Sequence, residues 1–452
     1  MFVKEKRFLR AVAGIAVPVG LQSMLQSSFA MIDQLMVGQL GSTAVSAVEV
    51  AGRPAFIYSV VVGAAAAIAG IMISQYLGKQ DEEMADRSLC VNLVAALLLG
   101  GLFTVLCLAF PGQIVSIYIK DDPAILAAGR DYLVRIVWTY LPMGAASILA
   151  VMIRCMDRAV WPLFAGIASA VVNTGLNYVL IFGRLGFPAL GVTGAAIASV
   201  ISQLVNLLLI LAMFYRVRVR KRGGLRFSLS LGAGGWKQYL VMLLPILINE
   251  FLWSVGQNVN TFIYGHLEYG DLAAMSMTGP IQGLFTGALG GVAQAAGILI
   301  GKRLGAEEYD EAYQESKRLI WYGITGSLVL SALLIWLRGP YVLLYKVEPG
   351  VQATARELLL LFAILAPVKV TNMILGGGIV RSGGKTTYIM LIDMAGTWLV
   401  GAPLGLVTAF VFHLPIGWVY FILSQEELVR LVMTLVVFKR KTWMHSLSTE
   451  RT

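Results

Sequence analysis

Charge is what this 452-residue sequence lacks most, because only 13% of its residues are charged. An ordinary soluble domain carries about 25%, and a chain with half of that cannot cover a water-facing surface. This scarcity excludes the soluble globular class. The apolar residues, 58% of the total, are gathered in long runs, and about 20 apolar residues in a helix cross the hydrocarbon core of a bilayer. The sequence therefore predicts an all-α integral membrane protein.

Cysteine and histidine are also scarce, with three of each. Their spacing shows neither a C-x-x-C motif nor a cluster, so we expect neither a disulfide framework nor a metal site of these ligands. Enzyme motifs such as G-x-S-x-G and H-E-x-x-H are missing. The segment RSGGKTT at 381–387 ends like a phosphate-binding loop, but Ile379 stands where that loop needs a glycine. We expect no catalytic residue, no ATP site and no cofactor, so that the energy must come from an ion gradient.

The apolar runs are long enough to span a bilayer and number about twelve. They lie near 10–37, 44–76, 88–110, 128–153, 160–183, 190–215, 239–265, 272–300, 318–337, 357–380, 387–411 and 416–438.

Basic residues gather in three places: near the N-terminus, in the loop RVRVRKRGGLR at 216–226, and at 439–441. Basic loops favour the cytoplasmic side of a membrane, and an even number of spans puts all three on one side. The net charge of +10 therefore indicates topology and not a nucleic-acid partner. We expect a multi-pass protein of the cell membrane with both termini in the cytoplasm.

An internal repeat is visible at a constant offset of 227 residues. It links Pro18 to Pro245, Gly38 to Gly265, Gly70 to Gly297, Gly78 to Gly305, Arg154 to Arg381 and Pro188 to Pro415. We interpret the chain as two homologous lobes of about six helices each around a central cleft, in the manner of parallel-repeat transporters. The predicted division is an N-lobe at 1–215, a basic cytoplasmic linker at 216–237, a C-lobe at 238–438 and a cytoplasmic tail at 439–452.

Five motifs give the chain a resemblance to a known family. They are IDQLMVGQLG at 32–41, ISQYLGKQDEEMA at 73–85, NTGLNYVLIFG at 173–183, GVTGAAIAS at 191–199 and IVRSGGKTTYIMLID at 379–393. In this order the chain resembles the multidrug and toxic compound extrusion (MATE) exporters of bacteria over nearly its whole length. The resemblance implies a secondary antiporter of two lobes that expels cationic or amphipathic xenobiotics in exchange for H⁺ or Na⁺. We expect it to act as a monomer.

An acid inside the first span, Asp33, is the leading candidate for the coupling site, because intramembrane acids are costly and usually functional. The N-lobe cation site of the family resembles the set Asp33, Asn173, Asn177 and Ser199. Many relatives have Asp where this chain has Asn177, and a hard cation prefers more negative charge. The departure favours a proton, while Na⁺ at Asp33, Asn173 and Asn177 stays open. The alternative for Asp33 is a purely structural hydrogen bond near the helix end.

The C-lobe offers Glu250, Lys369 and Asp393 as further coupling candidates, in the seventh, tenth and eleventh runs. The family often has an acid in the seventh helix, in several branches one turn further along, and some relatives have an acid where this chain has Lys369. Because an unpaired charge inside the membrane is costly, we expect Lys369 to pair with Glu250. The alternative is that Lys369 reaches the interface and Glu250 stands alone.

Polar and aromatic residues within the spans are candidates for the substrate cleft. Gln22 and Gln26 share a helical face with Asp33, Gln257 shares one with Glu250, and Trp253 suits a flat cation. A separate pair, Glu49 and Arg53 at i and i+4, is expected to form a structural ion pair.

Two other function classes compete with a multidrug antiporter. A flippase for lipid-linked oligosaccharides should have a strongly basic cavity, but the basic residues inside the spans are few: Arg53, Arg135, Lys369 and Arg430. A membrane scaffold or sensor would need neither the repeat nor the intramembrane acids.

Overall fold

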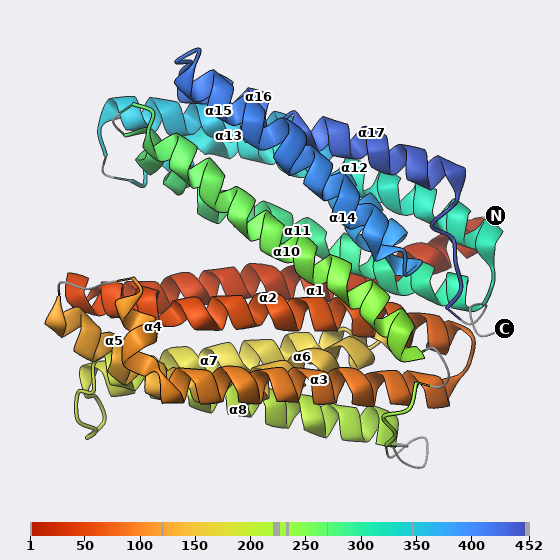
Figure 1. The fold of residues 1–452 in the computed structure, drawn as a ribbon, viewed down its shortest axis with the longest axis horizontal. Coiled ribbons are helices and arrows are strands. Elements are labelled where there is room, and N and C mark those ends of the chain that lie inside the picture. The colour runs from red at the N-terminus through yellow and green to blue at the C-terminus, as the bar shows by residue number, and fades with distance from the viewer. Residues whose placement is uncertain are drawn as a thin grey trace. The chain divides into compact units, whose positions relative to one another are not determined.

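The computed structural model describes residues 2–118, 122–219, 227–231, 235–268, 270–345 and 347–447, and every regular element in these ranges is a helix (Figure 1). The predicted all-α class is thereby confirmed. Four basic residues of the loop after the sixth run and the end of the tail lie outside the described residues, namely Arg220, Lys221, Arg222, Arg226 and 448–452.

The first half of the chain contains eight α-helices. A short 3₁₀-helix lies between α5 and α6, and a short π-helix follows α8. In chain order these elements are α1 (Phe2–Gly38), α2 (Ser42–Gly78), α3 (Glu82–Ala109), α4 (Pro111–Ser116), α5 (Pro123–Ile136), the 3₁₀-helix η1 (Val137–Thr139), α6 (Tyr140–Cys155), α7 (Val160–Phe182), α8 (Val192–Phe214) and the π-helix η2 (Tyr215–Val219).

The second half repeats this order with two more π-helical segments. Its elements are α10 (Gly235–Gly265), α11 (Asp271–Gly305), α12 (Tyr309–Val342), α13 (Pro349–Asn372), the π-helix η3 (Met373–Val380), α14 (Thr386–Met394), the π-helix η4 (Ala395–Gly401), α15 (Ala402–Phe410), α16 (Ile416–Leu423) and α17 (Glu426–Arg440).

Eleven helical stretches within the described residues are long and apolar enough to cross a membrane. The twelfth predicted run, 416–438, is divided into α16 and α17 at residues 424–425. Two glutamates open α17 directly after this break. The interruption is local, because helix resumes after two residues. Acids in the first turn of a helix are stabilised by the helix dipole, which suits the two glutamates to this helix start.

The chain forms two compact units. The first contains Met1–Ser23, Ser74–Gln80 and Ala233–Thr452, and the second contains Met24–Ile73 and Asp81–Gly232. Helix α1 therefore contributes its beginning to the first unit and its end, including Asp33, to the second. The lobe boundaries expected from the repeat, at residues 215 and 238, stay a prediction.

An aromatic cluster supports the second unit. Tyr58 of α2 is fully buried, and its ring lies 5.4 Å from that of Phe103 and 5.1 Å from that of Tyr140, measured between centroids. Its hydroxyl donates to the carbonyl oxygen of Ala96 on α3 at 3.2 Å. The hydroxyl is thus satisfied inside an apolar core, as buried polar groups require, and α2 is tied to α3 and α6.

In the first unit the repeat reappears as a reciprocal contact between the ends of α2 and α11. Gly78 lies against the backbone of Lys302, and its repeat partner Gly305 lies against the backbone of Gln75, so that neither glycine has room for a Cβ. Gln75 is 1% exposed and donates to the carbonyl oxygen of Ser382 at 2.7 Å. Small residues let helix backbones approach this closely in membranes.

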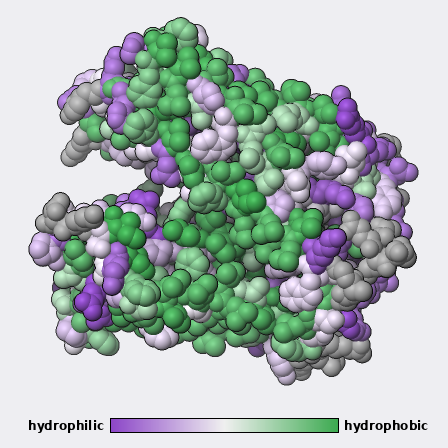
Figure 2. Space-filling model, in the orientation of Figure 1, coloured by the Kyte–Doolittle hydropathy of each residue, from purple (hydrophilic) through white to green (hydrophobic). Residues whose placement is uncertain are grey.

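Apolar side chains cover most of the visible surface, and hydrophilic ones gather toward its ends (Figure 2). Many helices expose large apolar side chains. The exposed fraction is 70% for Leu98 on α3, 67% for Trp321 on α12 and 76% for Leu399 in η4. A soluble monomer rarely tolerates so much exposed apolar surface. The surface is that of a protein surrounded by lipid.

Candidate functional site

Two polar centres lie on these helices, one in each unit, and the first is built around Asp33 of α1. The side-chain nitrogen of Asn177 on α7 donates to Asp33 Oδ1 at 2.6 Å. The amide of Asn173, one turn earlier, lies 2.8 Å from both carboxylate oxygens and donates to them through its nitrogen. Asn177 is 1% exposed and Asn173 is 9% exposed. The carboxylate is therefore held by buried neutral amides.

Two serines of helix α8 contact the Asn173 amide. The other end of the Asn173 amide faces the hydroxyls of Ser199 and Ser202 at 3.5 and 3.4 Å. Ser202 in turn donates to the carbonyl oxygen of Ser199 at 2.9 Å, and Ser169 of α7 donates to the carbonyl oxygen of Ser202 at 2.7 Å. The structure thus brings the four predicted residues together and adds Ser202. Their role in binding the coupling ion stays a prediction.

The second centre is a cavity of about 690 Å³ in the first unit, between α10, α11, α13, η3, α14, α16 and α17. Its wall carries seven charged side chains: Glu250, Lys369, Arg381, Asp393, Glu426, Glu427 and Arg430. All three C-lobe candidates from the sequence lie here. The wall therefore holds four acids and three bases, although the surrounding helices are apolar. Ionisable groups in membrane proteins usually face cavities or charged partners, and this wall follows that rule.

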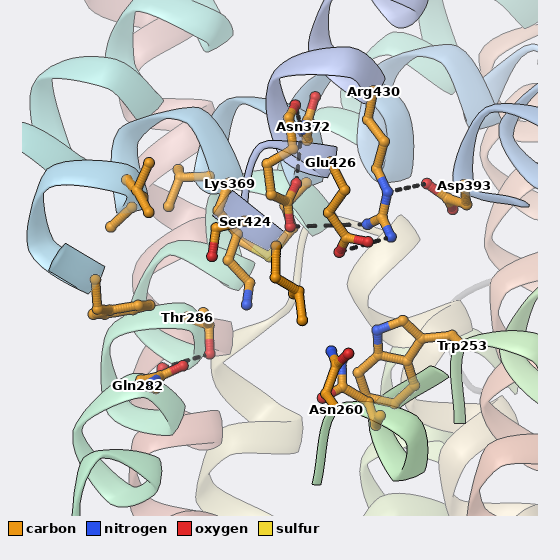
Figure 3. Close-up of a pocket in the computed structure, with 18 of the residues that line it drawn as sticks. Trp253, Asn260, Gln282, Thr286, Lys369, Asn372, Asp393, Ser424, Glu426 and Arg430 are labelled. Carbon is orange, nitrogen blue, oxygen red and sulfur yellow. Dashed lines mark hydrogen bonds and ion pairs between the residues drawn. The ribbon is translucent and has the colours of Figure 1, made fainter. Parts of the chain in front are cut away.

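Arg430 of α17 is the centre of a charge cluster in this wall (Figure 3). Its guanidinium lies 3.2 Å from Glu426 Oε1, 3.8 Å from Glu427 Oε1 and 3.9 Å from Asp393 Oδ1. It also donates to the hydroxyl of Thr397 in η4. Only 12% of the Arg430 side chain is exposed. One buried cation is therefore shared by three acidic side chains.

The acids of this cluster are fixed by amides as well. Asn249 of α10 donates to Asp393 Oδ2 at 2.9 Å. Asn372 donates to Glu427 Oε2 at 2.8 Å and to the carbonyl oxygen of the same residue at 2.7 Å. Asn372 ends α13 directly before η3. Asp393 lies one residue before the end of α14, and η4 follows directly. The π-helical turns, which often mark functional sites, thus adjoin the residues that bind the cluster.

Glu426 and Glu427 escaped the sequence reasoning, which noted Arg430 without its partners. They interrupt the last apolar run, and this position looks like an ordinary helix start. The repeat holds the missed signal, because the offset of 227 residues places Glu426 opposite Ser199 of the first centre. The same offset places Asn260, which lines the cavity, opposite Asp33.

The predicted ion pair between Lys369 and Glu250 is wrong for this structure. Both side chains line the cavity, but among the described residues neither makes an ion pair or a hydrogen bond with the other. The ammonium of Lys369 acts electrostatically on Glu426, and Glu250 is influenced by Arg381 and Asp393. Sharing one cavity did not bring the two within pairing distance, because α10 and α13 approach it from different sides.

The remaining predicted residues lie in three places: the cavity wall, α1 and the exposed face of α2. Trp253, 46% exposed, and Gln257 line the cavity with Glu250. Gln22 and Gln26 lie on α1 and do not belong to the cavity wall within the described residues. Glu49 and Arg53 form the predicted pair at 2.7 Å, confirmed as an exposed contact on α2.

Comparisons with known proteins agree with this architecture. The chain is 24% identical over 444 residues to an uncharacterized transporter, YisQ, of Bacillus subtilis, covering 94% of this chain and 93% of that protein. It is 25% identical over 438 residues to the multidrug resistance protein MdtK of Edwardsiella ictaluri, covering 93% of each.

Solved structures share the fold. A crystal structure of MATE in complex with MaL6 superposes with a TM-score of 0.85 at 16% identity, over 96% of both chains. An outward-facing multidrug resistance MATE family transporter of the MOP superfamily gives 0.84 at 18% identity, over 97% of this chain and 98% of that one.

A family model described as MatE matches the chain twice, over residues 18–179 and 245–407. The two matches begin at Pro18 and Pro245, which are the first pair of the sequence repeat. The predicted family is thereby confirmed. Since the matches cover more than half of the chain, this protein belongs to the MatE family, a family of membrane transporters and not of enzymes.

Proposed function

We propose that this transporter exports cationic or amphipathic organic compounds in exchange for protons, and that Asp33 carries the coupling proton. The observation that carries the proposal is that, of the residues the structure describes, only the neutral amides of Asn177 and Asn173 bind Asp33, at 2.6 and 2.8 Å. Two amides orient a carboxylate without neutralising it. A proton neutralises it completely, so that protonation changes the charge of the site by one full unit.

A proton fits this site better than Na⁺ for reasons of ligand charge. A hard cation needs several oxygen ligands with enough negative charge. Asp33 supplies one carboxylate, and Asn177 turns an N–H toward it where a second carboxylate would supply an oxygen. The amide nitrogens that bind Asp33 repel a cation from that side. Deprotonation of Asp33 on one side of the membrane and protonation on the other would give the cycle its direction.

The size and lining of the cavity in the first unit favour an organic substrate. Pockets for drug-sized ligands measure about 300–1,000 Å³ and combine apolar walls with a few polar groups, and this cavity has about 690 Å³. The aromatic side chains Trp253, Tyr264, Phe362 and Tyr420 line it beside the acids. Relatives named multidrug resistance proteins support the same class of substrate. The four acids of the wall weigh against a flippase, which would need a basic cavity for phosphate.

The coupling ion is tested in proteoliposomes that contain the purified transporter and a fluorescent organic cation. We expect export when a pH gradient is imposed at constant Na⁺, and none when a Na⁺ gradient is imposed at constant pH. Export driven by Na⁺ alone would contradict the proton proposal while leaving organic export intact. Absence of any transport under both gradients would contradict organic export itself.

A further inference from the structure

Lys369 makes no ion pair or hydrogen bond within the described part of the chain, and of the three bases in the cavity wall only Arg430 forms ion pairs there. Arg430 is bound by three acids, and Arg381 acts electrostatically on Glu250 and Asp393. The acid on which Lys369 acts, Glu426, already belongs to Arg430. Lys369 is therefore a positive charge in the cavity that the protein itself leaves without a direct partner.

The surroundings of the Lys369 ammonium suit an anion. Figure 3 shows the side chain reaching into the open centre of the cavity, between Ser424 and Thr286, and away from Arg430. The Ser424 hydroxyl can donate a hydrogen bond to a carboxylate beside the ammonium, whereas the Thr286 hydroxyl already donates to the carbonyl oxygen of Gln282 at 2.8 Å. A purely cationic ligand would meet repulsion at this end of the cavity, and like-charge contacts of this kind reject wrong ligands.

The opposite side of the cavity suits a cation. Trp253 lies across the open centre from Lys369 in Figure 3 and is 46% exposed there. Glu250 lies three residues earlier on the same helix, α10, also lines the cavity, and has no ion pair or hydrogen bond among the described residues. An amine between a carboxylate and an indole ring gains from both the ion pair and the cation–π contact. Lys369 and Glu250 thus carry opposite charges at different places on the cavity wall and do not pair with each other.

We propose that Lys369 is a specificity-determining residue that binds the anionic group of a zwitterionic amphipathic substrate, whose amine lies between Glu250 and Trp253. The inference rests on the proposed export of organic compounds and narrows its substrate class. A zwitterion can form a direct ion pair with both Lys369 and Glu250 at once, whereas a monocation pairs with Glu250 and leaves Lys369 without a direct partner. Selectivity for a carboxylate at one end of an amine-bearing compound follows from this difference.

The test uses two probes that differ in one group: a fluorescent aromatic amino acid with a tertiary amine, and its methyl ester. Affinity for the purified transporter is measured by calorimetry, and export is measured in cells that lack their own drug pumps. We expect the zwitterion to bind about tenfold tighter than the ester, the equivalent of one partly exposed ion pair. Lys369→Met should abolish this preference by weakening the zwitterion alone, and Lys369→Arg should keep it.

Matched variants of the same cavity separate specificity from structure. Glu250→Gln should weaken both probes equally, because both carry the amine, and Asn260→Ala should leave the preference unchanged. Lys369→Gln serves as a second neutral variant if Lys369→Met does not fold. A preference for the zwitterion that survives in the neutral variants, or is absent from the unchanged protein, overturns the inference. Binding that depends on Lys369 without export by the unchanged protein instead overturns the proposed function.

Discussion

The two polar centres solve the problem of a charge inside a membrane in opposite ways. Asp33 is one acid held by two amides, and within the described ranges no base pairs with it. Arg430 is one base surrounded by three acids. A single carboxylate held by neutral groups can change its charge by taking up a proton. A cluster of mutually paired charges resists such a change, because every member stabilises the others. The comparison assigns ion coupling to the first centre and stability to the Arg430 cluster of the second.

The repeat makes the comparison sharper, since the two halves share one helix order. Asp33 corresponds to Asn260 in the second half, and Ser199 corresponds to Glu426. At each of these related positions one half has an acid and the other has a neutral polar residue. Duplication therefore preserved the scaffold but distributed the charges differently, so that each half acquired its own centre.

The largest effect is expected from Asp33→Asn, which removes the ionisable group and keeps its shape. Export should fall to the level of cells without the transporter, because an amide cannot cycle a proton. The free energy of unfolding should change by only about 1 kcal/mol, the size of an ordinary hydrogen bond. Dye accumulation in pump-deficient cells measures export, and denaturant unfolding in detergent measures the free energy of unfolding. Normal export by the well-folded variant would remove Asp33 from the coupling mechanism.

The reverse pattern is expected from Arg430→Met. Removing the base leaves Glu426, Glu427 and Asp393 buried without their partner, and breaking a buried pair typically costs about 3–5 kcal/mol. Denaturant unfolding of the purified protein in detergent measures this loss. The double variant Arg430→Met with Glu426→Gln should recover part of it, because one uncompensated acid is then removed. A loss below about 1 kcal/mol would show that the cluster does not stabilise the fold.

A smaller effect is expected from Asn177→Asp, which places a second carboxylate where the amide now lies 2.6 Å from Asp33. Two carboxylates this close hold either a shared proton or a cation between them. We expect Na⁺ at constant pH to begin to drive export, with a response of about tenfold over the unchanged protein. The control is Asn173→Asp, tested in the same liposomes. No response to Na⁺ in either variant would mean that ligand charge does not decide the ion.

The smallest effect is expected from Arg53→Met, which breaks the predicted ion pair with Glu49 on the exposed face of α2. Both partners of this pair are exposed, Arg53 by 51% and Glu49 by 62%, and pairs of this kind contribute about 0.3–0.5 kcal/mol. Unfolding and export should both stay within error of the unchanged protein. A large loss of export with an intact fold would instead give the pair a functional role outside both centres.

Much of the first centre could be predicted from the sequence, because its residues carry local signals. Asn173 and Asn177 are one turn apart on a single helix, and Asp33 and Ser199 lie in motifs of the family. The second centre could not be predicted in the same way. Glu426 and Glu427 read as helix-start residues, and the contacts of Arg430 with Asp393 and Thr397 depend on how α17 packs against α14 and η4.

The sequence by itself determined the membrane class, the helical spans, the repeat and the family, because hydrophobic runs, a constant offset and ordered motifs are properties of the chain alone. The tertiary structure decided which charges meet. Lys369 and Glu250 were expected to pair on the cost of unpaired charge, yet each faces the same cavity from a different helix without touching the other. Distances between side chains depend on the rotation and the π-helical turns of the packed helices, and apolar periodicity does not encode either.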